Sequence, residues 1–148
     1  MPENHPHITV ATLVEQAGRL LMVQEHADGR LVYNQPAGHL EPGEALVTAA
    51  RRETLEETAW EVEITAFLGI YAYTSSTNGI SYVRHCFVAS PVAFFPEREL
   101  DRDIAAAVWL TPEEIAQHED ELRSPLVLAA VRDYLAGVRH PLSLISEF

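Results

Sequence analysis

Basic residues and cysteine are both scarce in this sequence of 148 residues. Only 10 lysine and arginine residues face 22 aspartate and glutamate residues, which gives a formal net charge of -12. Such a chain repels polyanions, so we expect no nucleic acid partner. Cys86 is the only cysteine, which excludes an intrachain disulfide. The sequence also contains no signal peptide and no apolar run long enough to span a bilayer, so we expect a cytoplasmic protein without membrane contact.

The remaining composition is that of an ordinary compact domain. Apolar residues make up 47% of the chain and charged residues 22%. A chain of this length can bury a sizeable core but has no room for a second one, so we expect a single domain over residues 1–148, as a monomer or small homo-oligomer. The acidic charge still permits a phosphate compound as substrate, because carboxylate oxygens hold divalent cations that supply the missing positive charge.

Residue patterns predict several strands around one clear helix. Strands are expected at residues 7–14, 19–26, 30–35, 62–73, 80–89 and 105–110. The first two strands should form a hairpin, and so should the two strands that flank the turn-like segment 74–79. A loop is expected from Gly38 to Gly43, because Pro36 forces an extended or turning backbone just before it.

The clearest helix covers residues 44 to about 58, where good helix formers follow the breakers Pro42 and Gly43. Two further helices should begin at 111–112 and 124–125, because each pair places a capping hydroxyl before a proline at the first helical position. Strands with an inserted helix and terminal helices predict an α+β fold. We expect a mixed β-sheet sandwiched between helices, in α/β/α layers.

Three glutamates of the central helix share one face. At 100° per residue, Glu53, Glu56 and Glu57 project within about a third of the helix circumference. Like charges four residues apart cost about 0.2–0.5 kcal/mol when exposed, and more when partly buried. A Mg²⁺ ion would remove this cost and leave coordination sites for phosphate oxygens and water. Taken alone, however, three glutamates are more often a solvated acidic surface.

The surrounding residues change that balance. Charged and glycine residues recur at fixed spacing before and within the helix, namely Gly38, Glu44, Arg52, Glu53, Glu56 and Glu57. This spacing resembles the Nudix box, which would occupy residues 38–60 and lies in the required loop and helix. Two positions depart from the family pattern: Ala59 replaces the glycine near the helix end, and Trp60 replaces the aliphatic residue after it. Ala59 either adopts a left-handed conformation at a cost of about 1 kcal/mol, or the helix ends differently.

The resemblance implies a Nudix fold and hydrolysis of a phosphoanhydride bond with Mg²⁺, or Mn²⁺ in its place. The implied metal ligands are the carboxylates of the three glutamates and the backbone carbonyl of Gly38. Arg52 and Glu44 would orient those carboxylates through a salt bridge. Glu53 and Glu57 would be the principal ligands, and Glu56 either a further ligand or the base that activates water. A loop acid could serve as the base instead.

Asp103 and Asp101 are the loop acids that could serve as this base. Asp103 lies six residues before Trp109, roughly where many Nudix enzymes place an auxiliary acid. A distant acid needs only to reach the attacking water, so either residue could act. Acids before a strand are nevertheless commonly just solvated.

Three residues outside the box are candidates for substrate binding. Arg84 lies inside an apolar strand, where a phosphate or a box glutamate would be a suitable partner, although a surface position is about as plausible. Tyr33 and Gln35 could stack on and hydrogen-bond to a pyrimidine or purine ring, and core packing explains Tyr33 almost equally well. The sequence contains neither a P-loop nor a Gly-x-Ser-x-Gly motif, so nucleotide kinases and serine hydrolases find no support.

Segments that flank the box, or lie elsewhere in the chain, narrow the resemblance to one phosphatase branch of the family. These segments are residues 7–11, 33–41, 123–127 and 140–142. The branch implies release of orthophosphate from nucleoside di- and triphosphates, thiamine pyrophosphate or hydroxymethylpyrimidine pyrophosphate. The alternatives are an ADP-ribose or dinucleotide pyrophosphatase, which would yield nucleoside monophosphates, and a catalytically silent domain that senses nucleotides.

Overall fold

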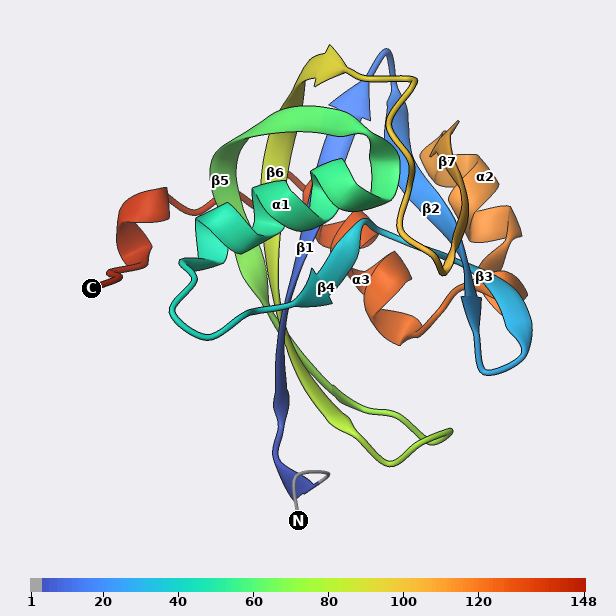
Figure 1. Ribbon diagram of the computed structural model, residues 1–148, viewed down its shortest axis with the longest axis horizontal. Coiled ribbons are helices and arrows are strands. Elements are labelled where there is room, and N and C mark those ends of the chain that lie inside the picture. The colour runs from blue at the N-terminus through green and yellow to red at the C-terminus, as the bar shows by residue number, and fades with distance from the viewer. Residues whose placement is uncertain (1–3) are drawn as a thin grey trace.

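The computed structural model describes residues 4–148 and consists of a mixed sheet with helices on both sides (Figure 1). The strands are β1 (His7–Gln16), β2 (Arg19–Ala27), β3 (Arg30–Asn34), β4 (Ala37–His39), β5 (Trp60–Thr74), β6 (Ser81–Phe94) and β7 (Ile104–Leu110). The helices are α1 (Leu46–Thr58), α2 (Pro112–Gln117) and α3 (Pro125–Leu135), with short 3-10 turns η2 (Glu119–Glu121) and η3 (Leu142–Leu144). None of the helices in residues 4–148 is long and apolar enough to cross a membrane. The predicted α+β class is confirmed.

The sheet divides where β1 and β2 separate. Its strand order is β3-β2-β1-β6-β5, with β4 paired to β1 and β7 paired to β2. The expected β1–β2 hairpin is present, but the two strands pair only beside their turn. Farther along, β1 pairs with β6 in parallel and with β4 in the antiparallel direction, whereas β2 pairs with β3 and β7. The chain between β3 and β4 therefore crosses from one half of the sheet to the other.

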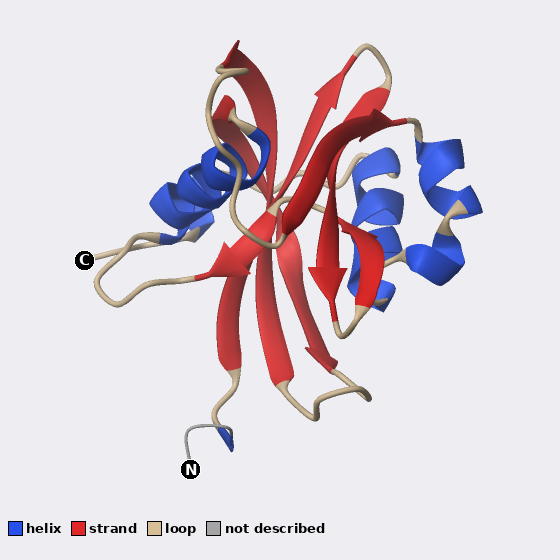
Figure 2. Ribbon diagram, turned by 45° about the vertical axis from the view of Figure 1, so that its right-hand side comes forward, coloured by secondary structure: helices blue, strands red, loops and turns tan. Residues whose placement is uncertain are grey.

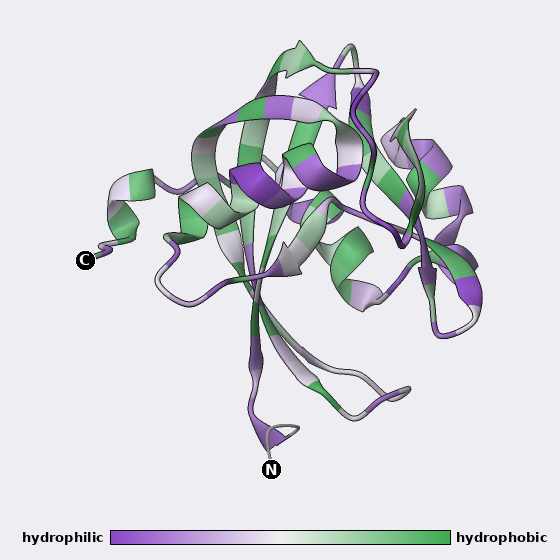
Figure 3. Ribbon diagram, in the orientation of Figure 1, coloured by the Kyte–Doolittle hydropathy of each residue, from purple (hydrophilic) through white to green (hydrophobic). Residues whose placement is uncertain are grey.

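Alternating residues of β1 pack into two separate cores, because successive strand side chains point to opposite faces. Ala11 and Leu13 belong to the core that includes Ile115 of α2 and Val127 of α3. Val10 and Val14 belong to the other core, beneath α1. Figure 2 shows α1 on one side of the sheet and α2 and α3 on the opposite side. In Figure 3 the central strands are mostly hydrophobic, whereas hydrophilic residues stand out on α1. The predicted layering is thus observed.

Two strand predictions fall short of the observed elements. Gly38 and His39, the first two residues of the expected loop, belong to β4, because β1 supplies their pairing partners Val10 and Thr9. Strand β6 continues past Ala89 to Phe94 although it contains Pro91. Pro91 pairs with β5 at a register shift, which is the kind of irregularity that tolerates a residue without an N–H group. The β5–β6 hairpin itself is confirmed.

The end of α1 settles which conformation Ala59 adopts. Its φ angle is 64°, in the left-handed region, and its N–H donates to the carbonyl of Leu55 at 2.9 Å. Ala59 is also buried, with 3% of its surface exposed. The first alternative from the sequence is therefore the correct one, and alanine occupies a conformation that favours glycine.

Candidate active site

Strand β4 lies directly against the acidic face of α1. The N–H of Ala37 donates to Glu57 Oε1 at 3.0 Å. A Cβ atom placed on Gly38 would come within 2.1 Å of the carboxyl carbon of Glu53. Only glycine fits at this position without displacing Glu53, so the glycine is required by close packing and not by its backbone angle.

Arg52 joins the carboxylates at one edge of this face. Its Nε and Nη2 donate to the two carboxylate oxygens of Glu44 at 2.6 and 3.0 Å. Its Nη1 donates to Glu53 Oε1 at 2.8 Å and to Glu56 Oε1 at 3.0 Å. The hydrogen bond with Glu44 raises the pKa of Arg52 and lowers that of Glu44. The implied ion pair is thus present and orients two of the box glutamates.

Burial makes two of these carboxyl groups costly to ionise. It raises the pKa of Glu53 to about 7, although Arg52 opposes the shift. It raises the pKa of Glu57 to about 9 against the opposing hydrogen bond from Ala37, and the nearby charges of Glu25, Glu53 and Asp101 add to the rise. A bound divalent cation would offset this cost, because it favours the charged carboxylates.

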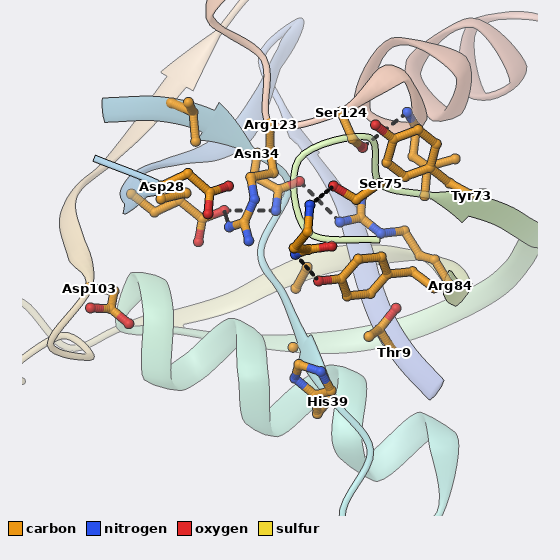
Figure 4. A pocket seen from close by; sticks show the side chains of 18 of the residues that line it. Thr9, Asp28, Asn34, His39, Tyr73, Ser75, Arg84, Asp103, Arg123 and Ser124 are labelled. Atoms are coloured by element: carbon orange, nitrogen blue, oxygen red, sulfur yellow. Dashed lines mark hydrogen bonds and ion pairs between the residues drawn. The ribbon is translucent and has the colours of Figure 1, made fainter. Parts of the chain in front are cut away.

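Asp101 completes a group of three acids on the side of α1. Ligand oxygens of Glu53, Glu56 and Asp101 lie within 4.8 Å of one another. The N–H of Asp101 donates to the backbone carbonyl of Glu56 at 3.0 Å, which fixes the loop before β7 against the helix. Asp103 does not join this group. Its carbonyl accepts from the N–H of His26, and its side chain lines the neighbouring cavity (Figure 4).

A cavity of about 590 Å³ extends from this acidic group between the two halves of the sheet. Residues that line it include Gly38, Glu53 and Glu57 near α1, Glu25, Asn34, Arg84 and Arg123 farther along, and Tyr73, Ser75 and Tyr82 from the β5–β6 hairpin. Figure 4 shows Asn34, Arg84 and Arg123 converging on the cavity, with Asp28 on one side and Tyr73 and Ser75 on the other. The volume is sufficient for a small organic diphosphate.

Arg84 brings a buried positive charge into this cavity. Only 7% of its surface is exposed. Its Nη1 donates to Gln35 Oε1 at 3.1 Å and its Nη2 to Asn34 Oδ1 at 3.2 Å. Among residues 4–148, no carboxylate forms a salt bridge with it, and burial lowers its pKa. A buried guanidinium whose hydrogen bonds go to neutral side-chain amides is well suited to a phosphate group.

The other two predicted substrate-binding residues do not line the cavity. Gln35 is buried and acts as a support, because its Nε2 donates to the carbonyl of Val127 while its Oε1 accepts from Arg84. Tyr33 packs against His118 with ring centroids 4.7 Å apart, and its hydroxyl accepts from Gln24. The position of Tyr33 favours the packing role that the sequence left open, and contact with substrate stays a prediction for both residues.

A family model of the NUDIX domain matches residues 3–131. The chain belongs to the Nudix family. It is 38% identical over 143 residues to the phosphatase NudJ of Escherichia coli, covering 97% of this chain and 92% of that protein. A solved NUDIX hydrolase from Nitrosomonas europaea matches with a TM-score of 0.95 and 41% identity, over 97% of this chain and 98% of that one. A MutT protein from Methanosarcina mazei, at 20% identity and TM-score 0.73, covers 90% and 97% and shows the fold alone.

The chain is therefore a Nudix phosphohydrolase, and its donor set fits the divalent cation that Nudix hydrolases generally use. All the candidate ligands are oxygens, which hard cations such as Mg²⁺ prefer. Two observations support the fit: the oxygens of Glu53, Glu56 and Asp101 are clustered, and Gly38 leaves just enough room for the Glu53 carboxylate. Glu57 and the carbonyl of Gly38 complete the candidate set.

Some cavity residues of this Nudix hydrolase could not be recognised in its sequence. Glu25 accepts hydrogen bonds from Asn34 Nδ2 at 2.9 Å and from Arg123 Nη1 at 3.0 Å. The only indication in the sequence that Glu25 has a function is that this charged residue lies in an apolar strand. Its partners lie 9 and 98 residues away along the chain, so no local spacing could connect them.

The sequence also contains no lysine, so every basic side chain in the cavity is an arginine or a histidine.

Proposed function

We propose that this Nudix hydrolase acts as a single domain that hydrolyses a phosphoanhydride bond in a small di- or triphosphate with Mg²⁺ or Mn²⁺. The proposed substrates are nucleoside di- and triphosphates, thiamine pyrophosphate and hydroxymethylpyrimidine pyrophosphate, with orthophosphate as product. One observation carries this proposal: a single cavity has the carboxylates of Glu53 and Glu57 at one end and the guanidinium of Arg84 on its wall, and this guanidinium forms no salt bridge with any of residues 4–148. A metal ion and a phosphate chain together neutralise both groups.

The carboxylates of Glu53, Glu56 and Glu57, with the carbonyl of Gly38, would hold the cation. When bound, it supplies positive charge to phosphate oxygens and lowers the pKa of water that it holds. Arg52 keeps the carboxylates of Glu53 and Glu56 in place through its own anchor on Glu44. The base that takes the proton from the attacking water is one of the box carboxylates or a loop acid.

The candidates for the base differ in their surroundings. Glu57 is nearly buried and is hydrogen-bonded to Ala37, which leaves it little freedom to move. The Glu56 side chain is 33% exposed, so it can exchange a proton with solvent. Asp103 lies in the cavity wall, where a substrate phosphate can pass beside it. We favour Glu56, with Asp103 as the alternative.

The test measures orthophosphate release from a panel of nucleotides and thiamine pyrophosphate with Mg²⁺, Mn²⁺ or EDTA. Activity is expected only with a cation, and Glu57→Gln should lower kcat at least a hundredfold, because it removes a buried ligand charge. Glu63→Gln is the matched control, since Glu63 is an exposed glutamate on β5 and its loss should leave kcat within about twofold. Full activity of Glu57→Gln would refute the site.

The products separate the proposal from its alternatives. Orthophosphate from a nucleoside diphosphate supports it. Release of nucleoside monophosphate from ADP-ribose or a dinucleotide, without orthophosphate, would instead identify an ADP-ribose or dinucleotide pyrophosphatase. Saturable nucleotide binding without turnover of any substrate would identify the silent sensor domain.

A further inference from the structure

Glu25 is a buried carboxylate in the cavity that the proposed chemistry does not use. It lies on β2, only 8% exposed, in the wall of the cavity. Both of its hydrogen bonds, from Asn34 and Arg123, end on Oε1. Among the residues described, Oε2 has no partner, and no buried side-chain oxygen is left unsatisfied. Oε2 is therefore accessible from the cavity that Glu25 lines.

The hydrogen-bond partners of Glu25 fix its position. Arg123 forms a salt bridge with it at 3.0 Å, and the backbone N–H of Arg123 is itself anchored on the carbonyl of Tyr33. The Glu25 carboxylate accepts both of these hydrogen bonds, so a neutral organic group at Oε2 would bind through an N–H or O–H donor. The guanidinium of Arg123, which also lines the cavity, offers further N–H donors beside that acceptor.

This arrangement favours different positions in the cavity for the phosphate chain of a substrate and for its organic group. A phosphate chain is attracted to Arg84 more strongly than to Arg123, because the charge of Arg123 is already balanced by Glu25. Asn34 hydrogen-bonds to both Glu25 and Arg84 and so holds them side by side. The part of the substrate without phosphate is then left to face Glu25 and Arg123. Val32 and Leu126, two buried apolar residues, line the same cavity. They suit the face of a flat ring better than the hydroxyls of a sugar.

We propose that Glu25 is a specificity-determining residue that accepts a hydrogen bond from an N–H group of a nitrogen heterocycle in the substrate. Arg123 donates to a neighbouring acceptor atom of the same ring. The substrate class is thereby narrowed to diphosphates of heterocycles that carry an N–H donor beside an acceptor, such as aminopyrimidine or nucleobase compounds. This inference rests on the proposed function but involves a different part of the cavity.

The test compares kcat/KM, measured with Mg²⁺, for three substrates: cytidine diphosphate, ribose 5-diphosphate and butyl diphosphate. The wild-type protein should prefer cytidine diphosphate. Glu25→Gln should lower kcat/KM for that substrate about tenfold to a hundredfold, the usual effect of losing a hydrogen bond to a charged group. The other two substrates should change less than about twofold, because they contain no heterocycle and therefore no N–H donor.

Asp28→Asn is the matched control, because it removes another negative charge from the same cavity. Asp28 has a φ angle of 52°, which asparagine also tolerates. This variant should keep the wild-type substrate preference. If Glu25→Gln proves unstable by thermal denaturation, Glu25→Asp retains the charge but withdraws the oxygen, and the same selective loss is expected from it.

Each other outcome overturns the inference in a recognisable way. An equal loss for all three substrates would mean that Glu25 only supports the structure. A loss shared with ribose 5-diphosphate would mean that it binds a sugar hydroxyl. The same loss in Asp28→Asn would indicate a general charge effect. Equal kcat/KM values of the wild-type protein for butyl diphosphate and cytidine diphosphate would show that it does not recognise the ring. If the wild-type protein hydrolyses none of the three substrates, nor any in the larger panel, the proposed function fails as well.

Discussion

The acidic end of the cavity requires that residue 38 has no side chain. Gly38→Ala would place a methyl group within 2.1 Å of the Glu53 carboxyl carbon, so either Glu53 or β4 must move. We expect at least a hundredfold loss of kcat/KM, because misplaced ligands weaken both the metal site and substrate positioning. Steady-state kinetics at several Mg²⁺ concentrations would measure it, and more Mg²⁺ should recover part of the loss.

Gly69 provides the control for that substitution. It is the other glycine whose φ angle is not positive, and a Cβ placed there would meet Tyr71 at an ordinary contact distance of 3.5 Å. Gly69→Ala should therefore keep its activity. If Gly38→Ala were as active as Gly69→Ala, the close packing of β4 on Glu53 would not matter for function.

At the level of single residues, the sequence predicted the helix side of the site better than the cavity side. Glu53, Glu56 and Glu57 lie within one helical turn of each other, so their shared face follows from helix geometry. Asp101 approaches them through a backbone hydrogen bond to α1, which no spacing in the sequence reveals. For the same reason the sequence could not separate the positions of Asp101 and Asp103. Asp103 lies in the cavity wall, and its role as the base stays a prediction.

Two alanines occupy left-handed backbone conformations at the ends of elements. Ala17 lies in the two-residue turn between β1 and β2, with φ 54°, and Ala59 ends α1 with φ 64°. The conformation costs an alanine about 1–2 kcal/mol relative to glycine. Ala17 is exposed, whereas Ala59 is buried. Burial of a methyl group contributes about 0.8 kcal/mol, so the strain at Ala59 is largely offset.

The two substitutions should accordingly differ in effect. Ala17→Asn should raise the free energy of unfolding by about 1 kcal/mol, because asparagine before Gly18 suits this hairpin turn. Ala59→Gly, which restores the usual box residue, should change it by less than about 0.5 kcal/mol, because the gain in backbone freedom is cancelled by the lost methyl contact. Urea denaturation measures both. A larger gain from Ala59→Gly than from Ala17→Asn would contradict the assigned role of the methyl group.

Elements with a local signal were predicted well, and those that depend on a distant partner were not. Helix α2 begins with a capping box formed by Thr111 and Glu114, both visible in the sequence. Strand β4 has only three residues and exists because β1 pairs with it, so its sequence reads as a loop. The extension of β6 through Pro91 likewise depends on its long pairing with β5.

At the scale of the whole molecule, the site exists because the sheet opens between β1 and β2. The crossing from β3 to β4 brings Asn34 and Gln35 into that opening, where they hold Arg84. The same crossing brings Gly38 against α1. Glu57 and Arg84 thus line one cavity, and within residues 4–148 neither of them forms a salt bridge. The stability of the fold should therefore depend on what neutralises these two buried groups.

This dependence predicts how pH and metal act together on stability. Burial raises the pKa of Glu57 from an ordinary value of 4.5 to about 9. Between these values the folded protein binds more protons than the unfolded chain, so the free energy of unfolding falls as pH rises. Without metal, Tm should fall by roughly 5 °C from pH 6 to pH 8. Mg²⁺ binds the ionised carboxylates, so it should raise Tm more at pH 8 than at pH 6.

The variants assign that effect to one side chain. In Glu57→Gln, the fall in metal-free Tm between pH 6 and pH 8 should become smaller, because the buried group no longer titrates, and the stabilisation by Mg²⁺ should weaken. Glu63→Gln should behave as the wild-type protein does, since Glu63 is exposed. Differential scanning calorimetry with EDTA or Mg²⁺ at the two pH values measures all three proteins. An unchanged pH dependence in Glu57→Gln would mean that another buried group, with Glu53 the nearest candidate at a pKa of about 7, controls the coupling between metal and fold.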